Sequence, residues 1–266
     1  MGSFGEANAP EASGLAASRR NPGLLYVVDD GPGTTSLLVI RARDGHLVGR
    51  LGVEGLDSVD TEDLAVGPCA RGGRHTCVYV ADIGDNVRGR DAVTILRLEE
   101  PDLGDGIPSS VAAESISVTY PDGAHDAEAL LVDHHATLGI VTKSPGRGGR
   151  GAAQLFLADE FRDGELTRAG RVRLPPPAQP FASAVVGNVV TAGDVVPGGV
   201  VLRTYDAIYE FRGSKSAPLR RFPGWPVTQL TAPSEPQGEA VAYGADGCSV
   251  YTVSESSGRL TVLRCR

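Results

Sequence analysis

The sequence predicts an all-β protein, a five-bladed β-propeller with three to four antiparallel strands in each blade. Three observations lead to this prediction. The chain has 35 Gly, 18 Pro, 5% aromatic and 41% hydrophobic residues, which is typical of many short strands joined by tight turns around a core. One acidic segment recurs five times, and strand-like runs follow each copy. No stretch has the periodicity of a convincing helix.

The repeated segment begins at five places, and the distances between them set the length of each blade. The copies EASGLAAS, DTEDLAVG, DAEALLVD, TAGDVVPG and QGEAVAYG start at Glu11, Asp60, Asp126, Thr191 and Gln237. Repeats of this length, each with three or four strands, are what a propeller requires. We therefore expect a single domain over residues 1–266. A β-sandwich with extra strands is the rival architecture, but it gives no reason for the acidic segment to recur.

Strand-like runs follow each copy in the same order. The second strands are expected at 24–30, 77–86, 138–146, 199–206 and 249–256, and the third at 36–45, 92–100, 152–159, 206–213 and 259–265. Fourth strands are expected at 46–53, 115–123, 166–175 and 218–224. The last repeat has none, so residues 1–9 are expected either to be flexible or to close the ring. We expect residues 144–151 to form a flexible basic insertion and residues 175–180 a stiff proline-rich connection.

The charge and the apolar pattern exclude two classes of partner. A formal charge of −8 would repel a phosphate backbone, so we expect no nucleic acid partner. No run of 18 apolar residues occurs, so we expect no membrane span. We expect a monomer that binds a cation and a small-molecule or anionic substrate.

The four cysteines form two local pairs, Cys69 with Cys77 and Cys248 with Cys265, each symmetric about a turn. Such symmetry places two residues opposite each other in an antiparallel hairpin, near the separation that a disulfide requires. We predict two structural disulfides rather than four free thiols, and hence an oxidising compartment. The opening MGSFGEANAP is typical of a trimmed mature end, so we expect a secreted protein whose export signal has been removed.

In a propeller the first strand of each blade lines the central channel, so one position of the repeated segment should face the axis. The third position is occupied by Ser13, Glu62, Glu128, Gly193 and Glu239. Three converging carboxylates cannot all stay ionised without raised pKa values or a cation. Oxygen ligands in an irregular arrangement suit Ca²⁺ better than Mg²⁺. We therefore predict one central Ca²⁺. Asp63 is out of phase and is expected to point away.

Position one of each segment and the end of each second strand should meet at one mouth of the channel. We predict that Asp60, Asp82 and Asp126 act in catalysis there, as acid or base. The substrate-binding candidates at the same mouth are Glu11, Asp85, Asn86, Lys143, Arg203 and Tyr205. 

Three simpler readings of these mouth residues stay open. Acidic residues at strand entrances are often solvated turn residues. The segment DIGDN, residues 82–86, is either a second cation loop or an Asx turn. Lys143 and Arg203 either bind a substrate anion or neutralise neighbouring acids.

The central register Ser13, Glu62, Glu128, Gly193 and Glu239 resembles that of the calcium-activated nucleotidases, which are five-bladed apyrases with one central Ca²⁺. The resemblance covers blade number and central motif but no nucleotide-contacting segment, and Gly193 stands where that family has a side-chain ligand. More distantly, the repeats resemble secreted phytase-like and lactonase-like propellers. The resemblance implies the fold and Ca²⁺ more than a substrate.

Several functions are compatible with this sequence. The first is a Ca²⁺-dependent hydrolase of phosphoesters, phosphoanhydrides or similar anionic substrates. The second is a noncatalytic extracellular binding module with a structural Ca²⁺. A five-bladed glycoside hydrolase, a lactonase and a lyase or cyclase are also possible on this scaffold, because fold does not determine function.

Overall fold

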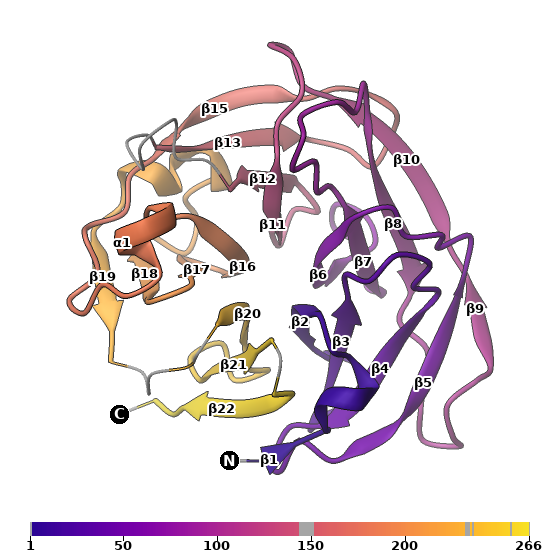
Figure 1. Cartoon of the computed structure of the whole chain (residues 1–266). Helices are drawn as coiled ribbons and strands as arrows, with labels where there is room; N and C mark the ends of the chain where they lie inside the picture. Colours follow the sequence, from indigo (N-terminus) through magenta and orange to yellow (C-terminus); the bar gives the residue numbers. More distant parts are fainter. Residues whose placement is uncertain (1, 144–151, 232–234, 236, 256, 266) are drawn as a thin grey trace.

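The computed structural model describes residues 2–143, 152–231, 235, 237–255 and 257–265. The basic insertion expected at 144–151 lies outside the described residues. Five sheets surround a central axis, and each has its first strand innermost (Figure 1). The protein is therefore the five-bladed β-propeller that the repeats predict. Among the described residues, no helix is long and apolar enough to cross a membrane.

In each of the five sheets, the four innermost strands pair antiparallel with their neighbours. Blades 1 and 2 contain β2 Ala12–Ala17, β3 Leu24–Asp29, β4 Ser36–Arg41 and β5 Leu47–Glu54, then β6 Thr61–Pro68, β7 Thr76–Asp82, β8 Val93–Glu99 and β10 Glu114–Thr119. Blades 3 and 4 contain β11 Ala127–Val132, β12 Leu138–Thr142, β13 Ala153–Ala158 and β15 Thr167–Val172, then β16 Val190–Val196, β17 Gly199–Thr204, β18 Ile208–Arg212 and β19 Val227–Leu230. Blade 5 contains β20 Gly238–Tyr243, β21 Val250–Ser254, β22 Arg259–Leu263 and β1 Gly2–Ser3.

Three short strands link the blades at the outer rim. β1 pairs antiparallel with β22, so the two ends of the chain share one sheet and close the ring. β9 Ser110–Ala112 runs parallel to β5, and β14 Gly164–Glu165 runs parallel to β10. Each of these two strands belongs to the loops of the following blade. Backbone hydrogen bonds therefore join blade 1 to 2 and blade 2 to 3 as well as blade 5 to the N-terminus.

The fourth strand of blade 4 differs from its prediction. Residues 218–224 were expected to form it, but Leu219–Gly224 form the 3₁₀ helix η2, and β19 lies further along the chain. Pro223 cannot donate a ladder hydrogen bond, whereas Phe222 is buried in the core between blades 3 and 4. Packing of the apolar side chains thus favours one helical turn over a strand.

Both predicted disulfides are confirmed. Cys69–Cys77 closes the β6–β7 hairpin of blade 2, and Cys248–Cys265 joins the β20–β21 turn to the segment after β22. The described residues include no free cysteine. These cross-links reinforce two hairpins that are local in sequence.

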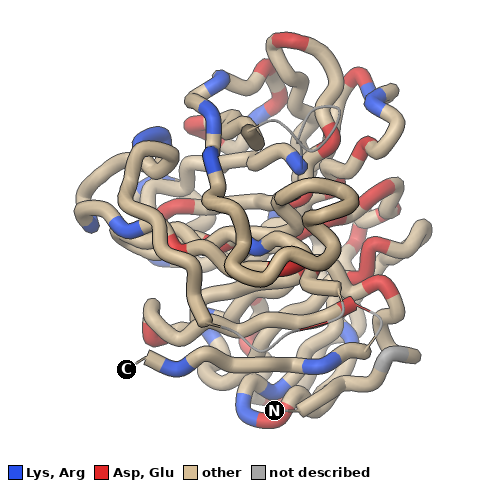
Figure 2. Tube along the Cα trace, turned by 60° about the vertical axis from the view of Figure 1, so that its left-hand side comes forward, with Lys and Arg blue, Asp and Glu red and all other residues tan. Residues whose placement is uncertain are grey.

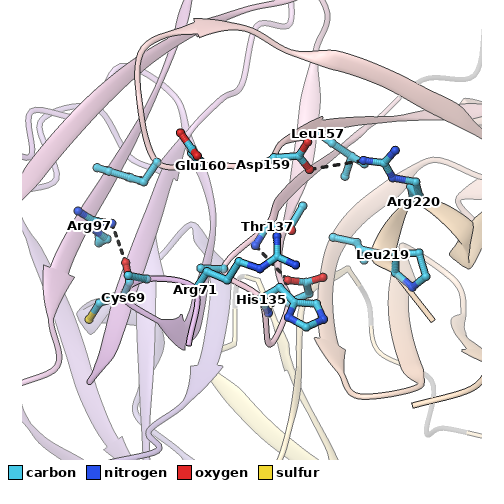
Figure 3. A pocket seen from close by; sticks show the side chains of 15 residues that line it. Cys69, Arg71, Arg97, His135, Thr137, Leu157, Asp159, Glu160, Leu219 and Arg220 are labelled. Atoms are coloured by element: carbon cyan, nitrogen blue, oxygen red, sulfur yellow. Dashed lines mark hydrogen bonds and ion pairs between the residues drawn. The ribbon is translucent and has the colours of Figure 1, made fainter. Parts of the chain in front are cut away.

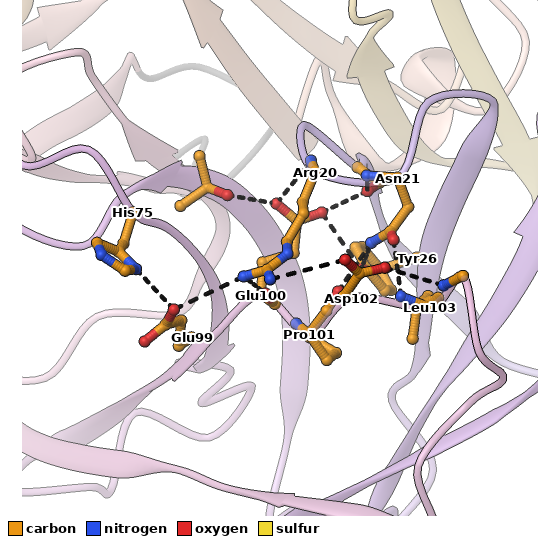
Figure 4. A network of polar contacts seen from close by, with 12 residues as sticks. Arg20, Asn21, Tyr26, His75, Glu99, Glu100, Pro101, Asp102 and Leu103 are labelled. Atoms are coloured by element: carbon orange, nitrogen blue, oxygen red, sulfur yellow. Dashed lines mark hydrogen bonds and ion pairs between the residues drawn. The ribbon is translucent and has the colours of Figure 1, made fainter.

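A buried carboxylate also ties blade 1 to blade 2 (Figure 4). Glu100, at the end of β8, is fully buried, and it accepts hydrogen bonds from the Ser18 and Thr76 hydroxyls and from the backbone N–H of Arg19 and Arg20. The phenol of Tyr26 also donates to it, at 3.3 Å. A charge removed from water needs such a full set of donors. This network has a structural role at the end of the propeller where the inner strands finish.

Asp63 connects three inner strands, contrary to the expectation that it points away. Its side chain is 0% exposed. Oδ1 accepts the N–H of Leu64 at 2.8 Å, while Oδ2 accepts that of Leu130 at 2.9 Å and that of Gly193 at 3.3 Å. These donors belong to β6, β11 and β16. The prediction was wrong because Asp63 follows a β-bulge, which changes the direction of the side chains after it.

Candidate functional site

Every inner strand carries a β-bulge at the same level of the channel. At this level, the register between the first and the second strand shifts by one residue in all five blades. A bulge leaves one residue unpaired and redirects its side chain. The bulged residues are Ser13, Glu62, Glu128, Thr191 and Glu239, and all five are buried. Ser13 Oγ donates to Glu62 Oε2 at 3.3 Å, so residues 49 positions apart meet at the axis.

The register predicted for the fourth blade was wrong by two residues. Thr191 occupies the bulge, and its hydroxyl donates to the carbonyl of Gly238 at 2.9 Å. Gly193 instead lies close to the side chains of Leu202 and Leu131. A Cβ at this position would lie 2.8 Å from Leu202 and 3.0 Å from Leu131, so there is no room for a larger residue. The alignment had matched Asp194 to Asp63.

Three carboxylates at the channel form a cluster. Glu62, Asp126 and Glu128 each offer an oxygen, and these oxygens lie within 4.8 Å of one another. The ammonium group of Lys143 forms an ion pair with Glu128. The structure thus brings Asp126, predicted at the mouth, next to two of the predicted metal ligands. It also shows that Lys143 neutralises an acid, which was one of the two alternatives for that residue.

The acids of the channel are difficult to ionise together. Burial, with the charges of Glu128 and Asp60, raises the pKa of Glu62 to about 11. Burial raises the pKa of Glu128 to about 8, although Lys143 opposes the shift. Burial and the charges of Glu128 and Glu255 raise the pKa of Glu239 to about 9. Such shifts indicate that the site must hold either protons or an additional cation at neutral pH.

Asp60 lies directly against the cluster at the mouth, which we define as the face where the inner strands begin. The backbone of Gly84 covers both carboxylates, because a Cβ at Gly84 would lie 2.4 Å from Asp60 Cγ and 2.4 Å from Glu62 Oε1. Burial and the charge of Asp126 raise the pKa of Asp60. Asp30 faces the same mouth, where burial and the charges of Glu11 and Glu255 raise its pKa to about 7. Both positions suit a proton acceptor.

Asp82 was predicted to be catalytic, but its carboxylate is already occupied. Arg90 binds it through two hydrogen bonds of 3.1 Å, and the backbone N–H of Asp60 donates to it at 2.8 Å. A bidentate pair with Arg occupies both oxygens of a carboxylate and fixes its orientation. Asp82 therefore positions Asp60. The sequence gave no reason to single out Arg90, since one Arg among many carries no pattern.

The segment DIGDN forms an Asx-type loop, which was one of its two predicted alternatives. The carboxylate of Asp85 is buried and accepts the N–H groups of Gly89 at 2.8 Å and Arg90 at 2.9 Å. Its own N–H donates to Asp126 Oδ1 at 3.0 Å. Asp85 thus holds the loop and orients Asp126, while the neighbouring Asn86 is exposed. Asp85 was predicted to bind substrate, and in the structure its oxygens accept these backbone N–H groups.

Arg203 was predicted as a substrate-binding residue, and this prediction was also wrong. Its side chain is 4% exposed and pairs with Glu235 at 2.7 Å. The guanidinium fits under blade 5 because Gly238 has no side chain, since a Cβ there would lie 2.0 Å from Nη2. The buried pair joins β17 to the segment before β20. A substrate at the mouth cannot reach it.

The remaining candidates, Tyr205 and Glu11, lie at the mouth. Tyr205 is half-buried, and its pKa is raised by burial and by the charge of Glu239, an effect that Lys143 opposes. Glu11 is exposed and forms a second acidic group with Asp29 and Asp30. In the side view of Figure 2, acidic residues gather toward one side of the molecule and basic residues toward the other. The mouth thus gathers several acidic side chains, among them Glu11, Asp30 and Asp60.

Fold and site together define a five-bladed propeller with a buried acidic centre. No protein-family model matches the sequence, and the search of curated proteins found no match. The structure is similar to that of a protein named U3-55K, with 12% identity, a TM-score of 0.40 and coverage of 91% of this chain and 60% of that one.

Two further structures are similar at comparable levels. A hydrazine synthase chain from Kuenenia stuttgartiensis is 12% identical, with a TM-score of 0.48 and coverage of 97% of this chain and 96% of that one. A gluconolactonase from Xanthomonas campestris is 14% identical, with a TM-score of 0.44 and coverage of 90% and 67%. These comparisons do not confirm the resemblance to the calcium-activated nucleotidases.

Proposed function

We propose that the chain is a secreted, Ca²⁺-dependent hydrolase whose site is the acidic mouth of the propeller. One observation carries the proposal: oxygens of Glu62, Asp126 and Glu128 lie within 4.8 Å of one another, where the inner strands begin. The two confirmed disulfides support an oxidising, extracellular location.

The chemistry of the donor set fits a hard divalent cation. All three side chains offer oxygen, as Ca²⁺ prefers, and they come from two rigid inner strands or from the residue just before one. Ser13 Oγ supplies a fourth oxygen, hydrogen-bonded to Glu62. Bound there, the ion would supply Lewis-acid polarisation of a substrate oxygen. It would also relieve the repulsion that raises the pKa values of these carboxyl groups.

We assign proton abstraction to Asp60. Its carboxylate adjoins Glu62, and no described side chain donates a hydrogen bond to it, in contrast to Asp82. The backbone N–H of Asp60 donates a hydrogen bond to Asp82 Oδ1, and the bidentate pair with Arg90 keeps that oxygen in place. A base within reach of a water beside a polarised carbonyl accelerates hydrolysis by about 10²- to 10⁴-fold.

The mouth favours an uncharged ester or lactone over a phosphorylated substrate. Arg203 is buried, Lys143 is paired with Glu128 and Arg90 with Asp82, so these three cations already neutralise acids. Five exposed apolar side chains also stand at this face, on its loops and on the short helix α1 Ser183–Val186: Val59, Val87, Phe181, Val185 and Val186. Such a rim suits the apolar part of an ester.

A noncatalytic binding module is the second candidate, because Lys143 already places a cation beside Glu128. In that case the ammonium group would stabilise the ring of blades, and turnover would be absent. Calorimetric titration with CaCl₂, combined with hydrolysis assays on lactones, carboxylic esters, phosphomonoesters and nucleotides, distinguishes the two candidates. We expect Ca²⁺ binding and EGTA-sensitive hydrolysis of an uncharged ester.

Three variants sharpen this test. Glu62→Gln with Glu128→Gln should abolish Ca²⁺ binding, and Asp60→Asn should retain binding but lose at least about 100-fold in kcat. Glu54→Gln, an exposed acid on the outer strand β5, is the matched control and should change neither. Ca²⁺ binding without turnover on any substrate would support the binding module, and undiminished binding by the double variant would refute the proposed ion site.

A further inference from the structure

A second cavity opens at the face opposite the mouth, between blades 2, 3 and 4 (Figure 3). Its volume is about 750 Å³, within the range of small-molecule sites. The lining comes from the turn after β6, the turn after β11, the turn after β13 and the start of η2. It shares no residue with the acidic mouth.

The floor and one wall of this cavity are apolar. Leu157 and Leu219 are buried beneath it, and Phe161 stands at its side. Phe161 is held in place by the Arg97 guanidinium, 4.1 Å from the ring centroid, and by an edge contact with Tyr79. Arg97 in turn donates to the Cys69 carbonyl at 2.7 Å. A fixed aromatic wall suits an apolar or aromatic group of a ligand.

A buried carboxylate faces the same cavity. Asp133 is 5% exposed, and its Oδ1 accepts the N–H groups of His135 at 2.8 Å and Thr137 at 3.0 Å. No described residue donates a hydrogen bond to its Oδ2. Because Asp133 lines the cavity, its Oδ2 is available to accept hydrogen bonds from the N–H groups of a ligand, such as an ammonium.

Two arginines stand at the rim. Figure 3 shows Arg71 reaching across the cavity toward the turn that carries Thr137 and His135. Arg71 forms no hydrogen bond or ion pair with any described residue. Arg220 makes only a loose, exposed pair with Asp159, at 3.6 Å. A guanidinium of this kind can bind a carboxylate with two hydrogen bonds.

From these contacts we infer that the cavity binds a zwitterionic amino acid with an apolar side chain. The ammonium group binds Asp133 Oδ2, the carboxylate binds Arg71, and the side chain packs on Leu157, Leu219 and Phe161. An α-amino acid carries its two charges beside one carbon, which suits an arginine that reaches toward the turn where Asp133 lies, and the pair of opposite charges selects a zwitterion over a simple anion or cation. The inference is independent of the function proposed for the mouth.

Calorimetric titration with L-phenylalanine tests this inference, with N-acetyl-L-phenylalanine and L-phenylalanine amide as probes that lack one charge each. We expect L-phenylalanine to bind, and each of the two analogues to bind at least about tenfold more weakly, since each loses one charged hydrogen-bonding pair. Absence of binding at about 10 mM L-phenylalanine, a concentration at which even a weak ligand of this kind binds detectably, would overturn the inference, as would equal affinity for all three.

Two variants assign the ends of the ligand. Arg71→Gln should weaken L-phenylalanine binding at least about tenfold and leave binding of the amide unchanged. Asp133→Asn keeps an oxygen for the two backbone N–H groups, so it should fold and lose the preference for the free ammonium over the N-acetyl probe. Arg74→Gln, exposed on the same turn as Arg71, is the matched control. Binding that neither variant alters would refute the assignment, and thermal melting checks that each variant is folded.

Discussion

Replacing Asp63 should destabilise the whole ring, because one carboxylate serves three inner strands. Asp63→Ala leaves the N–H groups of Leu64, Leu130 and Gly193 buried without an acceptor. Each orphaned donor costs about 1–3 kcal/mol. The total is smaller than the sum of these costs, because the substitution also removes a buried carboxyl group. The unfavourable burial of this group is what raises the pKa of Asp63 well above its usual range. We expect a net loss of about 3–5 kcal/mol, at the upper end of single substitutions.

Urea denaturation measures this loss, with the midpoint and the slope followed together. Asp63→Asn should lose less, about 1–3 kcal/mol, because one oxygen can still accept from two strands while the amide nitrogen faces the third N–H. Asp194→Ala is an internal comparison, since Asp194 accepts from only two donors, the N–H groups of Val195 and Tyr243. Asp105→Ala, which is exposed, should stay within about 0.5 kcal/mol of wild type.

Two results would refute this account of Asp63. A loss below about 1 kcal/mol for Asp63→Ala would show that water or a backbone shift satisfies the three N–H groups. Equal losses for the Asp63 and Asp194 variants would show that the number of strands joined does not determine the effect. An unchanged slope with urea would confirm that the variants differ in stability and not in compactness of the unfolded state.

Three further predictions concern stability. With EGTA present, the melting temperature should fall as the pH rises from about 4.5 to 9, because burial raises the folded pKa of Glu239 to about 9. The free energy of unfolding then falls as Glu239 ionises, by at most about 1.4 kcal/mol per pH unit. Added Ca²⁺ should flatten this profile, and a metal-free melting temperature that rises with pH would contradict the burial argument. Replacing Cys248 and Cys265 by Ser opens a loop with a sequence separation of 17 and should cost about 3 kcal/mol in urea denaturation. Gly238→Ala should cost at least about 2 kcal/mol, because its Cβ would lie 2.0 Å from Arg203 Nη2, and wild-type stability would mean that the guanidinium can move aside.

The repeated segment was enough to predict the number of blades and the register of four of the five inner strands. Glu62, Glu128 and Glu239 were placed correctly at one level because carboxylates at the start of an apolar strand are conspicuous. Thr191 lacks a charge, so the alignment followed Asp194 instead and was displaced by two residues. That the side chains at this level bind a metal ion remains a prediction.

Side-chain partners were not predictable, because they join segments that are distant in sequence. The burial of Arg203 depends on Gly238 and Glu235 in the next blade. The contacts that occupy the Asp82 carboxylate come from Arg90, eight residues away across a loop whose shape Asp85 determines. In each case local composition indicated a charged residue at the mouth, and tertiary contacts decided whether its charge was free.

The pairing of β1 with β22 has a consequence for how the protein is made. Gly2 pairs with Leu260, so β1 must wait for a strand made more than 250 residues later before it has a partner. Contacts of such large sequence separation form late and slowly. Until then the nascent chain presents an open arc of blades with two unpaired edges, which are sites of aggregation in β proteins. Attaching a bulky tag ahead of residue 2 should lengthen that vulnerable interval and lower the yield of folded protein.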